Sequence, residues 1–289
     1  MIVPFPAGSG SDVSARRIGQ IITQATQQSV VIENKPGANG FIAAQAAATA
    51  KPDGYTLFLT TNTTHSANPA LFKSLPYDPV RDFAPVIRVG TNGLAIVVGS
   101  NSAFKSLDDL ISAAKKAPGK LAFGSGSSSS QIASEMLASM AGIKLLHVPY
   151  KGMPQALTDV MSGQLDFMSA DYTTSTPLIQ AGSMRALAVT DTKRNPNLPD
   201  VPTVVELGLP KYAMYSWTGL FAPAGTPAEV IDKINSTVRA GLEQDDVKDT
   251  YQRSGATVWT STPAELGDFV KSEMSKWADV VKAAGIAPE

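Results

Sequence analysis

Two glycine- and serine-rich turns, each placed between a short apolar run and an amphipathic stretch, most constrain what this chain can fold into. The first reads Pro6-Ala7-Gly8-Ser9-Gly10-Ser11-Asp12, and the second reads Gly124-Ser125-Gly126-Ser127-Ser128-Ser129-Ser130. Such a turn joins a strand to a helix, and the free N–H groups and dipole at the start of a helix attract anions. Either turn alone could be merely a well-capped connection. Together they predict a ligand with carboxylate groups held between them.

Well-known glycine motifs do not account for these turns. Neither ends in the Gly-Lys-Ser/Thr of a nucleotide-binding loop, and neither has the third glycine of the dinucleotide fingerprint. The chain also lacks a G-x-S-x-G nucleophile elbow, which weakens an α/β-hydrolase interpretation. Because no clustered Lys or Arg accompanies the turns, their hydroxyl groups suit a carboxylate better than a polyphosphate.

Composition excludes several classes of protein and of site. With 289 residues and a net charge of −1, the chain is long enough for two domains and has no basic excess for nucleic acid, so we expect no nucleic-acid partner. Cysteine is absent and only His65 and His147 could supply imidazole, so we expect no disulfide, metal centre or cofactor. No apolar run reaches the roughly 20 residues of a membrane helix. Met1 directly precedes a strand-like run, so we expect a trimmed amino terminus whose missing leader says nothing of the compartment.

Short strand-like runs alternate with amphipathic segments along the chain. We expect strands at residues 30–33, 55–60, 95–98, 166–168 and 186–190, and a helix at 41–50. This rhythm predicts an α/β fold with mostly parallel sheets covered by helices.

Three capping motifs predict where further helices begin. Ser106-Leu107-Asp108-Asp109 is typical of a capping box. Thr226-Pro227-Ala228-Glu229 and Thr262-Pro263-Ala264-Glu265 each predict a helix with Thr as the N-cap and Pro at the first helical position. We assign these helices to the scaffold.

Two segments, residues 86–93 and 215–223, could carry the chain between two lobes. Domain 1 would then be discontinuous, with residues 1–91 and 219–289, and domain 2 would span residues 92–218. Two crossings make a hinge, and ligands favour the cleft that such a hinge closes.

Candidate ligand-binding residues follow from these turns and from loops at the ends of predicted strands. In domain 1 the candidates are Phe5, Ala7, Ser9, Gly10, Ser11, Asp12, Thr61, Asn62 and His65. Asp12 falls in a first helical turn, where compensation of the helix dipole is the favoured role, and His65 could donate to a carboxylate or cap a turn. In domain 2 the candidates are Ser125, Ser127, Ser128, Tyr150, Asp171 and Tyr172, whereas His147 is expected to be structural.

Many stretches in order along the chain resemble the extracytoplasmic solute receptors of the tripartite tricarboxylate transporter family, the Bug-type receptors. The matching stretches include Val3-Pro4-Phe5-Pro6-Ala7-Gly8, Glu33-Asn34-Lys35-Pro36-Gly37-Ala38-Asn39-Gly40, Pro52-Asp53-Gly54-Tyr55-Thr56-Leu57, Asp82-Phe83-Ala84-Pro85, Val148-Pro149-Tyr150-Lys151-Gly152, Pro199-Asp200-Val201-Pro202-Thr203 and Phe221-Ala222-Pro223-Ala224-Gly225-Thr226-Pro227. The resemblance implies a two-lobe, type II periplasmic-binding-protein-like fold that closes on an organic acid and delivers it to membrane permease subunits. It also implies that backbone groups and ordered water at the first turn hold one carboxylate. The clipped amino terminus and the run of serines at 127–130 depart from the family pattern.

Three functional interpretations follow, and the receptor is favoured. We expect a monomeric periplasmic receptor without catalytic residues, whose ligand is a dicarboxylate, either aliphatic or aromatic such as terephthalate. A sensor kinase could replace the permease as its partner. A Ser-dependent hydrolase would need Ser125 or Ser128 with His65 or His147 and Asp171, but nothing in their spacing supports that arrangement.

Overall fold

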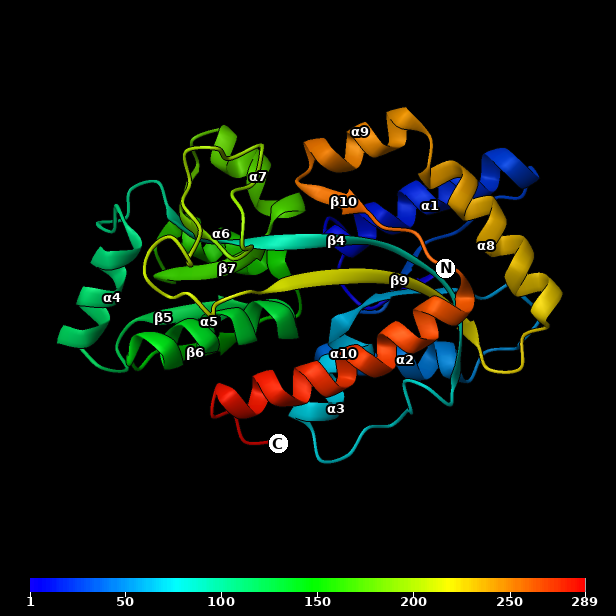
Figure 1. The fold of residues 1–289 in the computed structure, drawn as a ribbon, viewed down its shortest axis with the longest axis horizontal. Helices are drawn as coiled ribbons and strands as arrows, with labels where there is room; N and C mark the ends of the chain where they lie inside the picture. The colour runs from blue at the N-terminus through cyan, green and yellow to red at the C-terminus, as the bar shows by residue number, and fades with distance from the viewer. Residues whose placement is uncertain (289) are drawn as a thin grey trace.

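The computed structural model describes residues 1–288 and shows an elongated α/β molecule with helices on both faces of a twisted sheet (Figure 1). Its strands are β1 (Ile2–Val3), β2 (Glu33–Asn34), β3 (Phe58–Thr61), β4 (Phe83–Gly99), β5 (Ala122–Ser125), β6 (Leu146–Pro149), β7 (Phe167–Asp171), β8 (Met184–Val189), β9 (Tyr215–Pro223) and β10 (Ala256–Val258). The α-helices are α1 (Gly10–Thr26), α2 (Phe41–Ala48), α3 (Asn68–Leu71), α4 (Leu107–Lys116), α5 (Ser128–Ala141), α6 (Met153–Ser162), α7 (Tyr172–Gln180), α8 (Ala228–Leu242), α9 (Asp245–Arg253) and α10 (Pro263–Ala283). A 3-10 turn, η1 (Ala38–Gly40), and a π-helical turn, η2 (Thr63–Ala67), complete them.

The strands form one connected sheet with the order β2-β1-β3-β9-β4-β7-β5-β6, and β8 and β10 also pair with β4. Pairs at the two ends are parallel, as predicted: β1 with β2 and β3, and β5 with β6 and β7. Strands β4 and β9 run lengthwise through the molecule (Figure 1) and pair antiparallel with each other and with their neighbours. The predicted α/β class is therefore confirmed, with an antiparallel centre added.

Strand β4 changes partners near its middle. Up to Gly93 it pairs with β9 and β10, and from Leu94 onward it pairs with β7 and β8. We call the strands β1, β2, β3, β9 and β10 with helices α1, α2, α3, α8, α9 and α10 the β1 half, and the strands β5 to β8 with helices α4 to α7 the β5 half. The segment at 86–93, predicted to be a crossing, lies within this one strand, whereas the exact domain boundaries stay a prediction.

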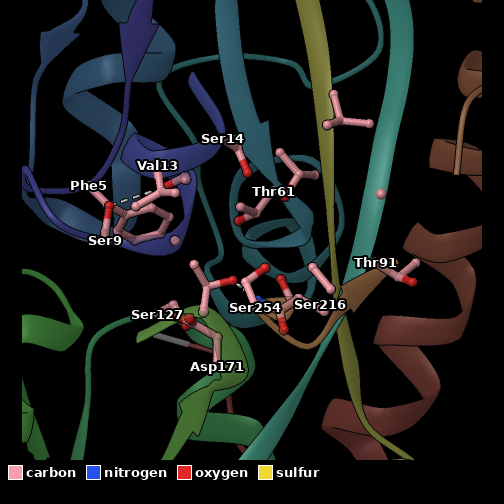
Figure 2. A pocket seen from close by; sticks show the side chains of 18 of the residues that line it. Phe5, Ser9, Val13, Ser14, Thr61, Thr91, Ser127, Asp171, Ser216 and Ser254 are labelled. Atoms are coloured by element: carbon pink, nitrogen blue, oxygen red, sulfur yellow. Dashed lines mark hydrogen bonds between the residues drawn. The ribbon is translucent and has the colours of Figure 1, made fainter. Parts of the chain in front are cut away.

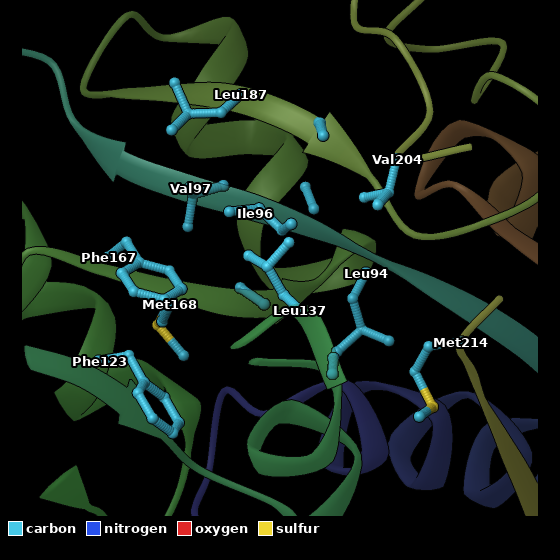
Figure 3. Close-up of a cluster of buried hydrophobic side chains, with 14 of the residues drawn as sticks. Leu94, Ile96, Val97, Phe123, Leu137, Phe167, Met168, Leu187, Val204 and Met214 are labelled. Carbon is cyan, nitrogen blue, oxygen red and sulfur yellow. The ribbon is translucent and has the colours of Figure 1, made fainter. Parts of the chain in front are cut away.

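One buried apolar cluster is centred on the β5 half and includes Ile96, Val97, Phe123, Leu137 and Phe167 (Figure 3). It also contains Leu71 of α3 and Trp277 of α10, so it reaches into the other half. Two smaller clusters lie in the β1 half, one including α1 and α8 residues and the other including α2 residues and Trp217. Burying such side chains stabilises each half by about 25 cal/mol per Å² of apolar area. Each half is therefore rigid where it faces the other. Among the helices of residues 1–288, none combines the length and apolar character needed to span a bilayer.

Candidate ligand-binding site

A cavity of about 120 Å³ lies where the two halves meet, and helices α1, α5 and α7 all begin at it (Figure 2). Since one water needs roughly 10–15 Å³, this space can hold a small organic molecule. Its lining consists of Phe5, Ser9, Gly10, Ser11, Val13, Ser14, Arg17, Thr61, Val89, Gly90, Thr91, Asn92, Gly126, Ser127, Ser129, Met153, Asp171, Thr173, Ser216, Thr218, Thr250, Tyr251, Ser254 and Ala256.

The first turn presents the start of α1 to the cavity. Ser9 is the N-cap, with extended backbone, and its hydroxyl accepts the N–H of Asp12 at 3.3 Å. Gly8 has a φ of +80°, a left-handed conformation that glycine adopts without strain. At Gly10 a Cβ would lie 3.1 Å from the Oδ1 atom of Asp171, so the missing side chain lets the other half approach the helix start.

The second turn presents the start of α5 in the same manner. Ser127 is the N-cap and accepts the N–H of Ser130 at 3.3 Å, and its hydroxyl lies 3.1 Å from that of Ser129. Gly126 is needed because a Cβ there would lie 2.3 Å from the backbone nitrogen of Met153. The predicted pair of capped turns therefore faces one cavity.

A third helix start, which the sequence analysis did not predict to bind an anion, belongs to α7. Its N-cap is Asp171, whose Oδ1 accepts the N–H of Thr174 at 2.9 Å and its hydroxyl at 3.0 Å. Burial raises the pKa of the Asp171 carboxyl, and the bonds from Thr174 counter only part of that effect. Asp171 is therefore easier to neutralise than an ordinary aspartate, which lessens its repulsion of an anion.

The electrostatics of the cavity favour an anionic ligand. Three helix N-termini carry partial positive charge, and within the lining of the described chain Arg17 is the one cationic side chain and Asp171 the one acidic one. No cluster of three or more potential metal-ligating His, Cys, Asp or Glu side chains occurs within residues 1–288. Serine and threonine hydroxyls supply most of the remaining polar contacts.

Seven of the predicted site residues line this cavity: Phe5, Ser9, Gly10, Ser11, Thr61, Ser127 and Asp171. Eight lie outside the lining: Ala7, Asp12, Asn62, His65, Ser125, Ser128, Tyr150 and Tyr172. Contact with a ligand stays a prediction for the first group, and the structure gives a local reason for most of the second.

In the β1 half, the residues outside the lining serve the scaffold. Asp12 is engaged by Arg16, Asn34 and the N–H of Gly8, and Ala7 is exposed within the turn. The Asn62 Oδ1 atom accepts a hydrogen bond from Ser216, a cavity residue, at 2.7 Å.

His65 lies in the core of the β1 half rather than at the cavity. It is fully buried, its ring stacks on Phe221 with centroids 4.0 Å apart, and its Nδ1 atom lies 2.9 Å from the Thr64 hydroxyl. Burial lowers the pKa of His65 to about 3. Of the two roles considered for His65, its position within the π-helical turn η2 and outside the cavity lining favours a role in the turn over donation to a ligand carboxylate.

In the β5 half, the residues outside the lining are engaged with neighbours. The Ser128 hydroxyl donates to Asn68 at 3.2 Å, across the junction of the two halves. The Tyr150 hydroxyl donates to Asp159 and that of Tyr172 to Asp191. Tyr150 and Tyr172 therefore have partners within the β5 half and do not line the cavity, and their contact with a ligand stays a prediction.

Ser125 and His147 are adjacent, with Oγ and Nε2 2.7 Å apart, as two members of a hydrolase triad would be. Both residues nevertheless lie outside the cavity lining. A nucleophile at Ser125 would therefore not face a ligand held in that space, and the pair joins neighbouring strands β5 and β6.

Several cavity residues were missed by sequence reasoning, notably Ser14, Arg17, Thr91, Ser216 and Tyr251. Ser14 and Arg17 could have been found, since they follow Gly10 at helical spacing and thus share its face. Thr91 and Ser216 lie in the segments predicted to be crossings, which were interpreted only as hinges. Tyr251 carries no local signal.

Comparison with known proteins gives the family of this chain. Residues 14–286 match the model of the tripartite tricarboxylate transporter family receptor. The fold is similar to that of Rpa4515 from R. palustris, solved with adipate (TM-score 0.97, 35% identity, covering 100% of this chain and 97% of that one). It is also similar to the periplasmic binding protein BugD (TM-score 0.95, 33% identity, 100% and 98%) and to MatC from Rhodopseudomonas palustris, solved with bound malate (TM-score 0.92, 33% identity, 97% and 97%). The chain therefore belongs to the receptor family of the tripartite tricarboxylate transporters, the Bug-type solute-binding receptors.

Proposed function

We propose that this receptor captures a small dicarboxylate in the cavity between its halves and delivers it to the membrane permease of a tripartite tricarboxylate transporter. The observation that carries the proposal is the convergence of three helix N-termini, those of α1, α5 and α7, on one cavity lined by hydroxyl groups. Each N-terminus favours an anion by about 0.3–1 kcal/mol or more when partly buried. Three of them around one small space have no comparable use for a neutral ligand.

The solved relatives support a diacid and a periplasmic location. Rpa4515 was solved with adipate and MatC with malate, both of which carry two carboxylates, and BugD is a periplasmic binding protein. We infer that this chain works in the same compartment and as a monomer. Its halves would correspond to domain 1, residues 1–91 with 219–289, and domain 2, residues 92–218, closing about β4 and β9.

A thermal-shift screen of organic acids tests the proposal. Malate, succinate, adipate and terephthalate are compared with their monoacid counterparts and with neutral diols. A ligand at a hundredfold excess over its Kd stabilises the folded protein by about 2.7 kcal/mol, so at least one carboxylate should raise the melting temperature by several degrees. If no carboxylate among them raised it, the proposed function would be wrong.

Delivery to a permease needs a separate measurement. Membrane vesicles that contain a permease of the tripartite tricarboxylate transporter family are supplied with a labelled diacid found in the screen. Uptake should require the receptor on the outside of the vesicle. Uptake at the same rate without the receptor would contradict the proposed partner while leaving ligand capture intact.

A further inference from the structure

The cavity continues beyond the three helix starts along one face of α1. Gly10, Val13, Ser14 and Arg17 all line it, and their spacing of three to four residues places them one above another on the helix. At a rise of 1.5 Å per residue, Ser14 lies about 6 Å and Arg17 about 10 Å along the axis from Gly10. The cavity therefore has two separated polar ends.

The far end is closed by the last turn of α9, which contributes Thr250, Tyr251 and Ser254. The carbonyl end of a helix repels an anion, so a negatively charged group here requires a cation beside it. Arg17 is that cation. Within residues 1–288 it forms no ion pair, in contrast to its neighbour Arg16, which is bound to Asp12 at 3.0 Å.

Tyr251 adds a donor that the folded protein leaves unused. The residue is only 9% exposed, and its hydroxyl has no hydrogen-bond partner among the described residues. Burial raises the pKa of this hydroxyl, and the nearby Ser14 and the charge of Arg17 oppose that rise. A buried hydroxyl without a partner costs about 1–3 kcal/mol, so the site is built for an acceptor that a ligand brings.

We propose that Arg17 and the Tyr251 hydroxyl bind the second carboxylate of the ligand, which makes this receptor selective for diacids long enough to reach from the helix starts to α9. This inference rests on the proposed function, because the first carboxylate is taken to occupy the helix starts. Five C–C bonds of ~1.5 Å each, as in a six-carbon diacid, place the carboxyl carbons roughly 6 Å apart. A six-carbon diacid therefore reaches the level of Ser14, where the Arg17 side chain, which leans toward the helix N-terminus, meets it.

Calorimetry with adipate and hexanoate on four proteins tests the assignment. The proteins are the wild type, Arg17→Gln, Tyr251→Phe and the control Arg253→Gln, which removes an equal charge from an exposed residue of α9 outside the cavity. Arg17→Gln should weaken adipate binding by about tenfold or more, because an ionic hydrogen bond is lost, and leave hexanoate binding within about twofold. Tyr251→Phe should weaken adipate binding by about fivefold.

The same measurements distinguish an error in this assignment from misfolding of a variant and from failure of the proposed function. Tyr251→Phe should not lower the melting temperature of the free protein, since its hydroxyl has no partner to lose. If Arg17→Gln left adipate binding unchanged, or weakened adipate and hexanoate equally, the assignment would be overturned while the carboxylate receptor stood. If Arg253→Gln reproduced the loss, the effect would be general charge and the assignment would also be overturned. Failure of the wild type to bind any acid in the screen would overturn both proposals.

Discussion

Asp12 directly follows Ser11, which lines the cavity. Both oxygens of the Asp12 carboxylate are hydrogen-bonded within the protein. Its two oxygens accept hydrogen bonds from the Nε and Nη2 atoms of Arg16, from Asn34 and from the N–H of Gly8. Burial alone would raise the pKa of Asp12, but the bonds from Arg16, Gly8 and Asn34 outweigh it and hold the pKa below its usual value. The ionised group therefore fixes the first turn, so that Ser9 and Ser11 face the cavity.

His65 leads to a prediction about pH. Its pKa is about 3 in the folded protein, whereas histidine in an unfolded chain titrates near about 6.5. Below about pH 6.5 the unfolded state binds a proton that the folded state excludes, so the free energy of unfolding falls by up to about 1.4 kcal/mol per pH unit. Above that pH the contribution of His65 is constant and fully present.

Urea unfolding of the wild type and of His65→Gln, at about pH 7.5 and about pH 5, measures this contribution. The variant is less stable at the higher pH because it loses the stacking on Phe221. As the pH falls, the wild type loses stability that the variant has no histidine to lose, so the difference between them should shrink. An equal difference at both pH values would show that His65 does not titrate in this way.

The serines that cap the helix starts at the cavity could be predicted from the sequence, because an N-cap hydrogen bond is local. Ser9 and Ser127 cap their helices through the N–H three residues on, a contact that needs no distant partner. Arg17 and Tyr251 could not be paired, since 234 residues separate them and only the packing of α9 beside α1 joins them at one cavity. The burial of His65 could not be predicted, because the π-helical turn that contains it leaves no pattern in the sequence.

At the scale of elements, the helix caps also show that local motifs can be predicted from the sequence and distant partners cannot. The capping boxes at Ser106 and Thr262 are confirmed, each with both reciprocal hydrogen bonds. The prediction at Thr226 is wrong by one residue: α8 begins at Ala228 with Pro227 as its N-cap, and the Thr226 hydroxyl donates instead to the carbonyl of Pro223. The same four-residue motif therefore gave two outcomes, because the incoming strand β9 offers Thr226 an acceptor.

The turn before α6 makes a prediction about the contact between the halves. A Cβ added to Gly152 would lie 2.4 Å from the Cδ atom of Pro6, which belongs to the other half. Gly152 has an extended backbone that alanine also adopts, so Gly152→Ala should fold normally but hold the halves apart. We expect weaker diacid binding, about tenfold or more, with a melting temperature of the free protein within a few degrees of wild type.

Lys151→Ala is the matched control, because Lys151 is the exposed neighbour in the same turn and lies outside the cavity lining. Calorimetry with adipate and thermal melts of both variants give the comparison. Wild-type affinity in Gly152→Ala would mean that the contact with Pro6 is not needed for binding.

At the scale of the whole molecule, the halves touch at polar points around the cavity and through an apolar cluster that Leu71 of α3 and Trp277 of α10 share with Leu137 of α5. Asn92 donates to Thr173 at 2.8 Å, and Ser128 donates to Asn68 at 3.2 Å. Because a hydrogen bond contributes only about 0.5–1.5 kcal/mol, the polar contacts around the cavity should open readily without ligand. The shared apolar cluster should stay intact, so that the halves open about it.

Small-angle scattering tests this prediction. The free receptor should have a larger radius of gyration than the receptor saturated with adipate, since the ligand adds contacts to both halves. Gly152→Ala provides the comparison and should compact less. An equal radius for the free and the saturated wild type, together with saturation shown by calorimetry, would contradict closure on the ligand.

Strand β4 has a further consequence for how this protein could be divided. Its 17 residues complete the hydrogen-bond ladders of both halves, with β9 and β10 before Leu94 and with β7 and β8 after it. A polypeptide cut at Gly93 would leave each fragment with a truncated strand and an unpaired edge, which recruits other chains. The two halves can therefore move apart when β4 bends, but cutting the chain there does not yield two complete folded units. Neither half is a module that could be transplanted by itself into another receptor.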